Sequence, residues 1–169
     1  MSKKFFGKYR GSVLSNVDPQ RIGRLHVKIP SLLASTPAIW AVPCFPCAGH
    51  QMGVWALPEI GAGVWVEFEE GDLTRPVWTG SWYASSADVP ALALAGDPVY
   101  PSIVLQTARQ NCIALSDASG PAGGIVIKTA SGAILSINDA GITISNGKGA
   151  VIAMNGPVVS INNGALAID

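Results

Sequence analysis

Residues 103–117 (IVLQTARQNCIALSD) and residues 125–139 (IVIKTASGAILSIND) repeat one pattern at a constant offset of 22 residues. Pairs of apolar residues separated by a single position occur in both copies and recur as far as residue 168. Asn-, Asp- and Gly-containing turns, which tolerate positive φ, separate the later pairs. The pattern predicts eight short β-strands joined by turns. The apolar pairs are Ile103/Leu105, Ile113/Leu115, Ile125/Ile127, Leu135/Ile137, Ile142/Ile144, Ile152/Met154, Val159/Ile161 and Leu166/Ile168.

Strands this short cannot support a hydrophobic core alone, because each presents only two apolar side chains on one face. Two arrangements would bury the pairs. One chain could coil as a solenoid, with three strands in each turn of about 21 residues. Alternatively, three chains could each form one face of a triangular prism, and their apolar pairs would meet on a shared axis. Each buried side chain would contribute about 1.5–3 kcal/mol to such a trimer. Periodicity alone does not separate these two arrangements.

The composition changes near Ala84. Eleven of the twelve aromatic residues precede it, and the last one is Tyr100. The segment Ala84–Pro101 is rich in Ala, Pro and Ser, and its prolines at 90, 98 and 101 disfavour a helix. We therefore predict a first domain of residues 1–83, an extended linker of residues 84–101 and a repeat domain of residues 102–169.

The first domain has the pattern of an all-β structure. Leu25, Val27 and Ile29 share one face of a strand, and polar residues alternate with them. Turn signals such as residues 16–19 (NVDP) and 70–72 (EGD) separate the segments. A small closed barrel or sandwich is predicted, and the whole chain is predicted to be all-β. The predicted strands are Lys8–Ser15, Arg24–Ile29, Ala38–Val42, Val54–Leu57, Gly63–Phe68 and Val77–Tyr83.

Charge is unevenly distributed, although the net charge is zero. Residues 1–30 hold seven Lys/Arg and one Asp, whereas residues 31–169 hold four Lys/Arg and ten Asp/Glu. The early cations alternate with apolar residues, which favours a solvated strand or a docking surface over a nucleic-acid arm. No stretch approaches the ~18 apolar residues of a membrane helix, and no secretory signal is evident. Three cysteines fit a reducing compartment, so we expect synthesis in the cytoplasm.

Cys44, Cys47 and His50 form the constellation that comes closest to a metal or redox site. Zinc normally takes four ligands, and one chain supplies only three here. We interpret Cys44, Cys47 and His50 as small loop residues, and we predict neither a metal site nor a cofactor. Cys112 aligns with Ile134 in the repeat and is predicted to be a packed residue.

The pattern of two further groups of side chains favours a plain structural role. Glu67, Glu69, Glu70 and Asp72 alternate along a strand into a turn, which indicates a solvated edge rather than paired catalytic carboxylates. No Ser-His-Asp set or phosphate-binding glycine loop occurs, so we predict no catalytic residue and no enzyme activity. The five tryptophans lie between residues 40 and 82, apart in sequence from the early cations. Packing is therefore favoured over stacking on single-stranded nucleic acid.

An ordered set of motifs occupies much of the first 83 residues. The motifs are residues 9–13 (YRGSV), 18–19 (DP), 23–30 (GRLHVKIP), 40–43 (WAVP), 57–72 (LPEIGAGVWVEFEEGD), 75–77 (RPV) and 80–83 (GSWY). This set resembles the N-terminal OB-fold domain of phage baseplate assembly protein V and of the related T4-type tail spike and VgrG proteins. The resemblance covers about 75 residues, and residues 57–83 are its most specific part.

The resemblance implies a trimeric OB-fold domain that docks under a tail hub. An intertwined trimeric β-helix, or β-prism, would follow as a needle that pierces the target envelope when a contractile sheath fires. The resemblance also favours the trimer over the solenoid. Expected partners are two more copies of the chain, the hub, baseplate wedge proteins and, transiently, the target membrane, but not nucleic acid. Assembly is expected in the bacterial cytoplasm. The alternatives are a single-stranded nucleic-acid-binding OB protein and the base of a receptor-binding tail fibre.

The sequence departs from some relatives in two ways. The linker leaves no room for the lysozyme domain that some relatives carry after the OB fold. Some phage relatives end in a metal-binding His-x-His apex, whereas His26 and His50 are the only histidines here. Residues 163–169 (NGALAID) predict a blunt last strand. We therefore expect a separate PAAR-like tip protein at the C-terminal end.

Overall fold

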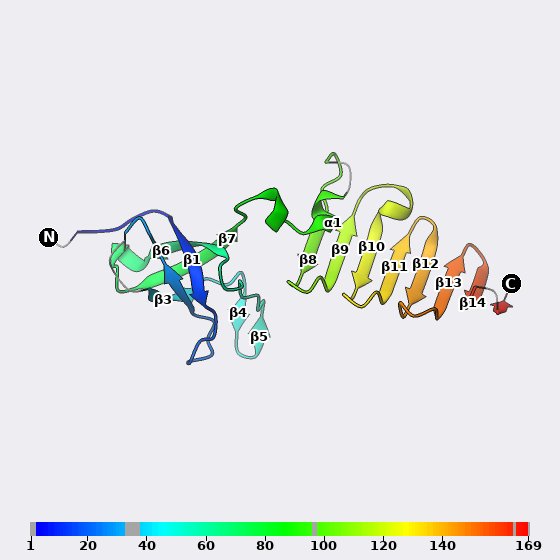
Figure 1. Ribbon diagram of the computed structural model, residues 1–169, viewed down its shortest axis with the longest axis horizontal. Helices are drawn as coiled ribbons and strands as arrows, with labels where there is room; N and C mark the ends of the chain where they lie inside the picture. Colours follow the sequence, from blue (N-terminus) through cyan, green and yellow to red (C-terminus); the bar gives the residue numbers. More distant parts are fainter. Residues whose placement is uncertain (1–2, 33–37, 96–97, 164, 169) are drawn as a thin grey trace. The chain divides into compact units, whose positions relative to one another are not determined.

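The computed structural model describes residues 3–32, 38–95, 98–163 and 165–168. The chain divides into two compact units, Met1–Ser86 and Ala87–Asp169, and each has its own strands (Figure 1). The predicted all-β class is confirmed, because every described helical segment is a single short turn. These segments are η1 (Glu69–Gly71), η2 (Ser86–Asp88), α1 (Ala91–Leu94) and η3 (Gly120–Ala122). Among the described residues, no helix has the length and apolar character needed to cross a membrane.

A closed five-stranded barrel forms the first unit. The order of hydrogen-bonded strands around it is β1-β2-β3-β7-β6, and β1 closes the barrel against β6. Neighbouring strands are antiparallel except for β3 and β7, which run parallel. A small mixed barrel of this kind is the architecture of an OB fold. The strands are β1 (Tyr9–Ser15), β2 (Leu25–Lys28), β3 (Ile39–Pro43), β6 (Gly63–Phe68) and β7 (Pro76–Trp82).

Leu25, Val27 and Ile29, which the sequence predicted to share one face, are all buried in the barrel core. Trp78 of β7 joins this core, and its indole N–H donates to the carbonyl oxygen of Gly23 at 3.1 Å. Alternation along β6 leaves Trp65 and Glu67 on the outer face of the barrel. The buried core residues are Val13, Leu25, Val27, Ile29, Ala41, Val64, Val66, Phe68 and Trp78.

The strand predicted at Val54–Leu57 is wrong. A small hairpin of β4 (Ala48–Gly49) and β5 (Met52–Gly53) forms just before it. The backbone N–H of Val54 donates to the carbonyl oxygen of Cys47 at 3.0 Å, which closes the hairpin rather than extending a sheet. Trp55 then packs on Phe45, with ring centroids 5.4 Å apart, from an irregular segment. The apolar composition of residues 54–57 therefore predicted a strand, whereas their side chains pack without backbone pairing to a neighbouring strand.

The linker predicted to be extended contains two helical turns, η2 and α1. Pro90 is the N-terminal cap of α1, and the backbone N–H of Ala93 donates to its carbonyl oxygen at 2.8 Å. A proline at the start of a helix costs no hydrogen bond, because the first N–H groups have no partner within the helix. The domain limits at residues 83 and 101 remain a prediction.

One eight-stranded antiparallel sheet forms most of the second unit (Figure 1). Its strands pair strictly in sequence order from β8 to β15, so each predicted apolar pair occupies one strand of a meander. A single-chain solenoid is excluded for these residues, because its successive strands would belong to different sheets. The strands are β8 (Ile103–Gln106), β9 (Cys112–Ser116), β10 (Gly124–Lys128), β11 (Ile134–Asn138), β12 (Gly141–Ser145), β13 (Val151–Asn155), β14 (Val158–Ile161) and β15 (Leu166–Ile168).

Candidate functional site

Two ladders of large apolar residues cross the sheet of the second unit on one face. Cross-strand partners in an antiparallel sheet lie side by side on the same face, so the register defines the ladders directly. The first ladder runs through Ile103, Leu115, Ile125, Ile137, Ile142, Met154 and Val159. The second runs through Leu105, Ile113, Ile127, Leu135, Ile144, Ile152, Ile161 and Leu166. We call this surface the ladder face.

The ladder face is open in the single chain. Ile103 is 65% exposed at the first strand, and Ile144 is still 45% exposed in the middle of the sheet. A contiguous apolar surface of this size is rarely left in water by a soluble protein. Burial of such side chains contributes about 1.5–3 kcal/mol each, so the ladder face favours association with other chains.

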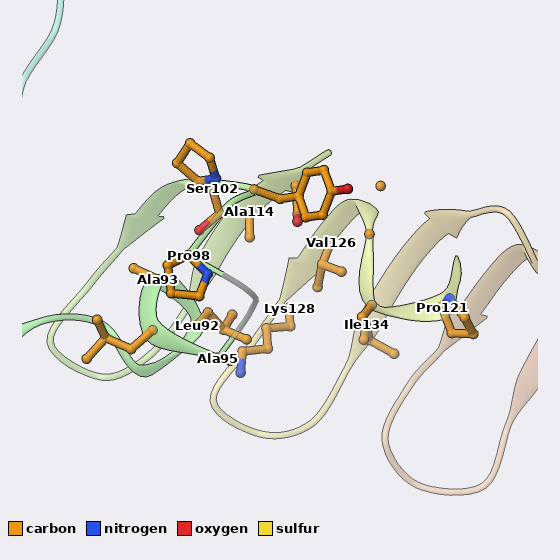
Figure 2. Close-up of a pocket in the computed structure, with 17 residues that line it drawn as sticks. Leu92, Ala93, Ala95, Pro98, Ser102, Ala114, Pro121, Val126, Lys128 and Ile134 are labelled. Atoms are coloured by element: carbon orange, nitrogen blue, oxygen red, sulfur yellow. The ribbon is translucent and has the colours of Figure 1, made fainter. Parts of the chain in front are cut away.

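The opposite face of the sheet carries smaller side chains. Its central row follows from the same register and contains Val104, Ala114, Val126, Ser136, Thr143, Ala153 and Ser160. Near β9, β10 and β11 this face is partly covered by the segment that contains α1. A cleft of about 530 Å³ lies between that segment and the sheet (Figure 2). The chain therefore covers part of its small-residue face and leaves the ladder face uncovered.

The cleft has a mostly apolar lining. Leu92 and Pro98 line it from the α1 segment, and Val126 and Ile134 line it from the sheet (Figure 2). Lys128 is the single charged residue among the described residues that line it. Cys112, on the same face of β9, is buried, as its alignment with Ile134 predicted. These contacts indicate packing of the linker against the sheet.

Cations and tryptophans lie together on the barrel surface. They are far apart in the sequence, but the prediction that they are also separated in the structure is wrong. The guanidinium carbon of Arg10 lies 5.5 Å from the ring centre of Trp65 and 4.8 Å from that of Trp82. The guanidinium carbon of Arg24 lies 5.2 Å from the ring centre of Trp40. Antiparallel pairing places Arg10 opposite Trp65, which no distance along the sequence reveals.

The side chains around Trp40 already have stacking, hydrogen-bond or ion-pair partners within the barrel. The His26 ring stacks on Trp40 with centroids 5.0 Å apart, and its Nε2 lies 2.9 Å from the carbonyl oxygen of Ala38. Arg24 pairs with Asp18, its Nη2 lying 2.8 Å from the Oδ1 atom. The β2–β3 surface is where many OB folds bind single strands. Among the described residues of this surface, Trp40 stacks on His26 and Arg24 is paired with Asp18, so their contacts are explained by packing within the barrel.

Cys44, Cys47 and His50 do not converge in the part of the chain that the structure describes. No group of three or more His, Cys, Asp or Glu side chains converges there. Cys44 and Cys47 are exposed, and both are free thiols. The assignment of these residues to a simple loop remains a prediction.

The acidic residues at the end of β6 are mostly engaged in local contacts. Glu67 pairs with Nζ of Lys8 at 3.0 Å, and Glu69 pairs with Arg75. Asp72 accepts hydrogen bonds from the backbone N–H and the hydroxyl of Thr74, and these bonds lower the pKa of its carboxyl. The absence of catalytic residues remains a prediction.

Sequence reasoning missed the most buried carboxylate of the barrel. The Asp18 side chain is 3% exposed and accepts from Nε and Nη2 of Arg24 at 2.9 and 2.8 Å. It also accepts from the backbone N–H groups of Gln20, Ile22 and Arg24. The Arg24 guanidinium, helped by these N–H groups, holds the pKa of Asp18 far below its ordinary value. The sequence pattern that could have revealed it is DPxxxxR in residues 18–24, in which the Asp18 side chain closes a loop.

Replacing Asp18 with Asn should destabilise the barrel at neutral pH and make its stability less sensitive to acid. A depressed folded-state pKa means that the carboxylate stabilises the fold fully above its ordinary pKa of 3.8. This stabilisation is lost as the pH falls through the folded-state pKa. Thermal unfolding followed by tryptophan fluorescence between pH 3 and 8 measures both effects. Equal melting temperatures for the two proteins at pH 7 would contradict this role.

Two family models match the sequence. Residues 9–83 match the type VI secretion system/phage-baseplate injector OB domain. Residues 102–167 match the phage baseplate V C-terminal trimerisation domain. The chain belongs to the phage baseplate V family. No curated protein matches it.

Family membership gives the ladder face its role. The trimerisation domain of the phage baseplate V family coincides with the strands that carry the two ladders. The chain is therefore a self-associating component of a phage baseplate or a related injector, and its second unit makes it a homotrimer. The OB-fold assignment of the barrel rests on both its strand order and the match to residues 9–83.

Proposed function

We propose that this protein is the central spike of a contractile injection machine. The barrel docks under the tail hub, and the second unit is a needle that pierces the target envelope when the sheath contracts. The observation that carries the proposal is the ladder face, which runs along every strand of a domain matching a trimerisation domain. Three such faces that meet on a common axis make a narrow shaft with a continuous apolar core.

Rigidity of the needle would come from two sources. Every neighbouring pair of strands from β8 to β15 is hydrogen-bonded, so a load along the succession of strands is carried by backbone hydrogen bonds. Burial of the ladder side chains at about 1.5–3 kcal/mol each resists separation of the three chains. Neither source requires covalent chemistry, and the proposed role is mechanical rather than enzymatic, without a cofactor.

The surface chemistry of the needle supports passage through an envelope. Between residues 131 and 168 only Asp139 and Lys148 are charged, and both lie between strands rather than within them. The outward row there contains Ser, Thr and Ala. Charged groups are the most costly to move into a medium of low dielectric constant, so an almost uncharged shaft lowers the barrier to entry.

The proposed partners follow from the two ends of the assembly. The barrel contacts the hub and the baseplate wedge proteins. Strand β15 has one hydrogen-bonded neighbour, β14, among the described residues, and a strand with one neighbour has backbone groups that can pair with another chain. We propose that a PAAR-like tip protein covers the three β15 edges. Assembly would take place in the bacterial cytoplasm, and contact with the target membrane would be transient.

Labelling of intact injection particles tests the spike assignment. Gold-tagged antibodies against this chain should bind on the tail axis, at the distal end of the extended particle. After contraction the label should lie beyond the baseplate, at the level of the target envelope. Quantitative mass spectrometry should give three copies per particle. A label on the sheath or on peripheral fibres would contradict the assignment and would instead support the base of a receptor-binding fibre.

A further inference from the structure

A hollow of about 340 Å³ lies on the surface of the barrel beside β1. One row of cross-strand partners on the outer face runs from β2 through β1 and β6 to β7, and it consists of Lys28, Ser12, Gly63 and Trp82. Small residues occupy the middle of this row, and the large ring of Trp82 ends it. The residues that line the hollow are Arg10, Gly11, Ser12, Pro30, Ser31 and Trp82.

The ring of Trp82 is held in place by its neighbours on β6. It lies so close to Gly63 that a Cβ added to this glycine would be 2.5 Å from the ring. Trp65 is two residues further along β6, and its ring centre lies 6.4 Å from that of Trp82. This wall of the hollow is therefore preformed and would lose little side-chain entropy when a partner binds.

Arg10 lies over both tryptophans without an acidic partner. It is opposite Trp65 in the register, and its guanidinium carbon is 5.5 Å from the ring centre of Trp65 and 4.8 Å from that of Trp82. Neither Arg10 nor the exposed Lys28 forms an ion pair with the described part of the chain. Positive charge therefore remains uncompensated beside the hollow. The cations of the barrel that do form ion pairs include Lys8, Arg24 and Arg75.

The indole N–H of Trp82 also lacks an acceptor among the described residues, although its nitrogen is buried. The indole of Trp78 provides the contrast, since its N–H donates to the carbonyl oxygen of Gly23. A buried donor without a partner destabilises a fold, and an acceptor supplied by another molecule would remove this cost. Trp82 and Arg10 line the same hollow, so one incoming group can reach both donors.

A carboxylate suits these donors better than a single strand of nucleic acid does. The edge of a guanidinium binds a carboxylate through two parallel hydrogen bonds, and stacking on an aromatic ring leaves that edge free. Single strands instead need bare aromatic faces on which bases stack. Arg10 already lies over the rings of Trp65 and Trp82, so a base would have to displace it. Tryptophan and arginine are also the side chains that contribute most to protein–protein contacts.

We propose that this hollow binds an acidic loop of the tail hub protein. A carboxylate of the loop accepts hydrogen bonds from Arg10 and from the indole N–H of Trp82, and the charge of Lys28 attracts the acidic residues around it. The inference rests on the proposed docking of the barrel under the hub, and it adds the surface that docks and the chemistry of its partner. The ladder face belongs to the second unit, so the contacts that make the trimer do not use this hollow.

Binding of the full-length trimer to the purified hub protein tests the proposal. Arg10→Glu should weaken binding by at least about 30-fold, because it removes a paired cation and adds a repelling charge. Trp82→Phe keeps a ring but removes the N–H, and it should weaken binding by about 3–10-fold. Arg21→Glu is the matched control, since Arg21 is exposed and has no ion pair within the described residues. This variant should bind like the parent protein in isothermal titration calorimetry, and thermal melting should show that all three barrels are folded.

Cross-linking identifies the partner segment directly. Ser31→Cys, in a chain whose Cys44 and Cys47 have been replaced by Ser, places one reactive thiol at the exposed rim of the hollow, since Cys112 is buried. A benzophenone maleimide attached to this thiol should link to the hub protein on irradiation. Mass spectrometry should find Asp or Glu in the linked hub peptide. A link only to another copy of this chain would overturn the proposal.

The outcomes distinguish this inference from the proposed function. If the hub protein binds the parent trimer and Arg10→Glu with equal affinity, docking stands through another surface and the acidic-loop proposal fails. If the hub protein does not bind the parent trimer, both the docking and the inference fail. A gel shift of single-stranded DNA that Arg10→Glu abolishes, with binding to the hub unchanged, would assign the hollow to nucleic acid instead.

Discussion

Replacing Ile144 with Asp should abolish the stable trimer. Ile144 lies near the middle of the second ladder, between Leu135 and Ile152, and it is 45% exposed in the single chain. Three copies of the chain would bring three carboxylates to the core of the needle, where no cation faces them. An unpaired buried charge costs several kcal/mol at each site, in addition to the ~1.5–3 kcal/mol lost with each isoleucine. Native mass spectrometry should show single 17.5 kDa chains or aggregates instead of the trimer.

The neighbouring residue provides the matched control. Thr143 is on the same strand and faces the opposite side of the sheet, between Ser136 and Ala153. Thr143→Asp introduces the same charge one position away, where it remains in water. This variant should stay trimeric, with a stability close to that of the parent protein. If both variants remain trimeric, or if both dissociate, the ladder face is not the trimer interface.

The repeat domain was predictable because its signal is local. Each apolar i, i+2 pair marks one strand face, and each Asn-Gly or Asp-containing turn marks a reversal, so strands β8 to β15 appear where the pattern places them. The antiparallel order follows, since short turns can only join neighbouring strands. The choice between one chain and three was not local. To choose between them, one must know which surface covers Ile103 and Ile144, and the pattern of a single sequence does not contain that information.

The barrel shows where local signals fail. Val54–Leu57 has the composition of a strand, but the hairpin before it ends the ladder at Val54, and Trp55 packs without backbone pairing. The prolines of the linker suggested an extended segment, whereas Pro90 starts the turn of α1. In both cases a residue type has two structural uses, and the surrounding contacts decide between them.

The contacts on the barrel surface could not be predicted from the sequence. Arg10 and Trp65 are 55 positions apart and meet because β1 pairs with β6 in one particular register. The register of β1 against β6 depends on the packing of the whole core, so no sequence motif predicts it. The positive φ of Glu70 is equally hidden, because glutamate has no preference for that conformation. Functional surfaces built from cross-strand neighbours therefore appear only in the folded structure.

Replacing Gly141 with Ala should strongly destabilise the needle. Gly141 begins β12 with φ 138°, a conformation that side chains rarely allow. A Cβ there would overlap the carbonyl oxygen of Met154 on the neighbouring strand. That atom belongs to the backbone ladder, so it cannot move without loss of pairing between β12 and β13. Overlap and backbone strain together should cost at least about 3 kcal/mol for each chain.

The Gly149→Ala variant distinguishes backbone strain from the overlap with Met154. Gly149 also has a positive φ, 103°, but a Cβ at this position meets nothing within 4 Å. Gly149→Ala should therefore cost only the conformational strain, about 1–2 kcal/mol. In denaturant unfolding, far-ultraviolet circular dichroism reports the strands of both units, whereas tryptophan fluorescence reports the barrel alone, so the transition seen only by circular dichroism is that of the needle. Gly141→Ala should lower the needle midpoint well below that of Gly149→Ala and leave the barrel transition unchanged. Equal midpoints would mean that φ alone, and not the close approach of β12 to β13, makes glycine necessary at residue 141.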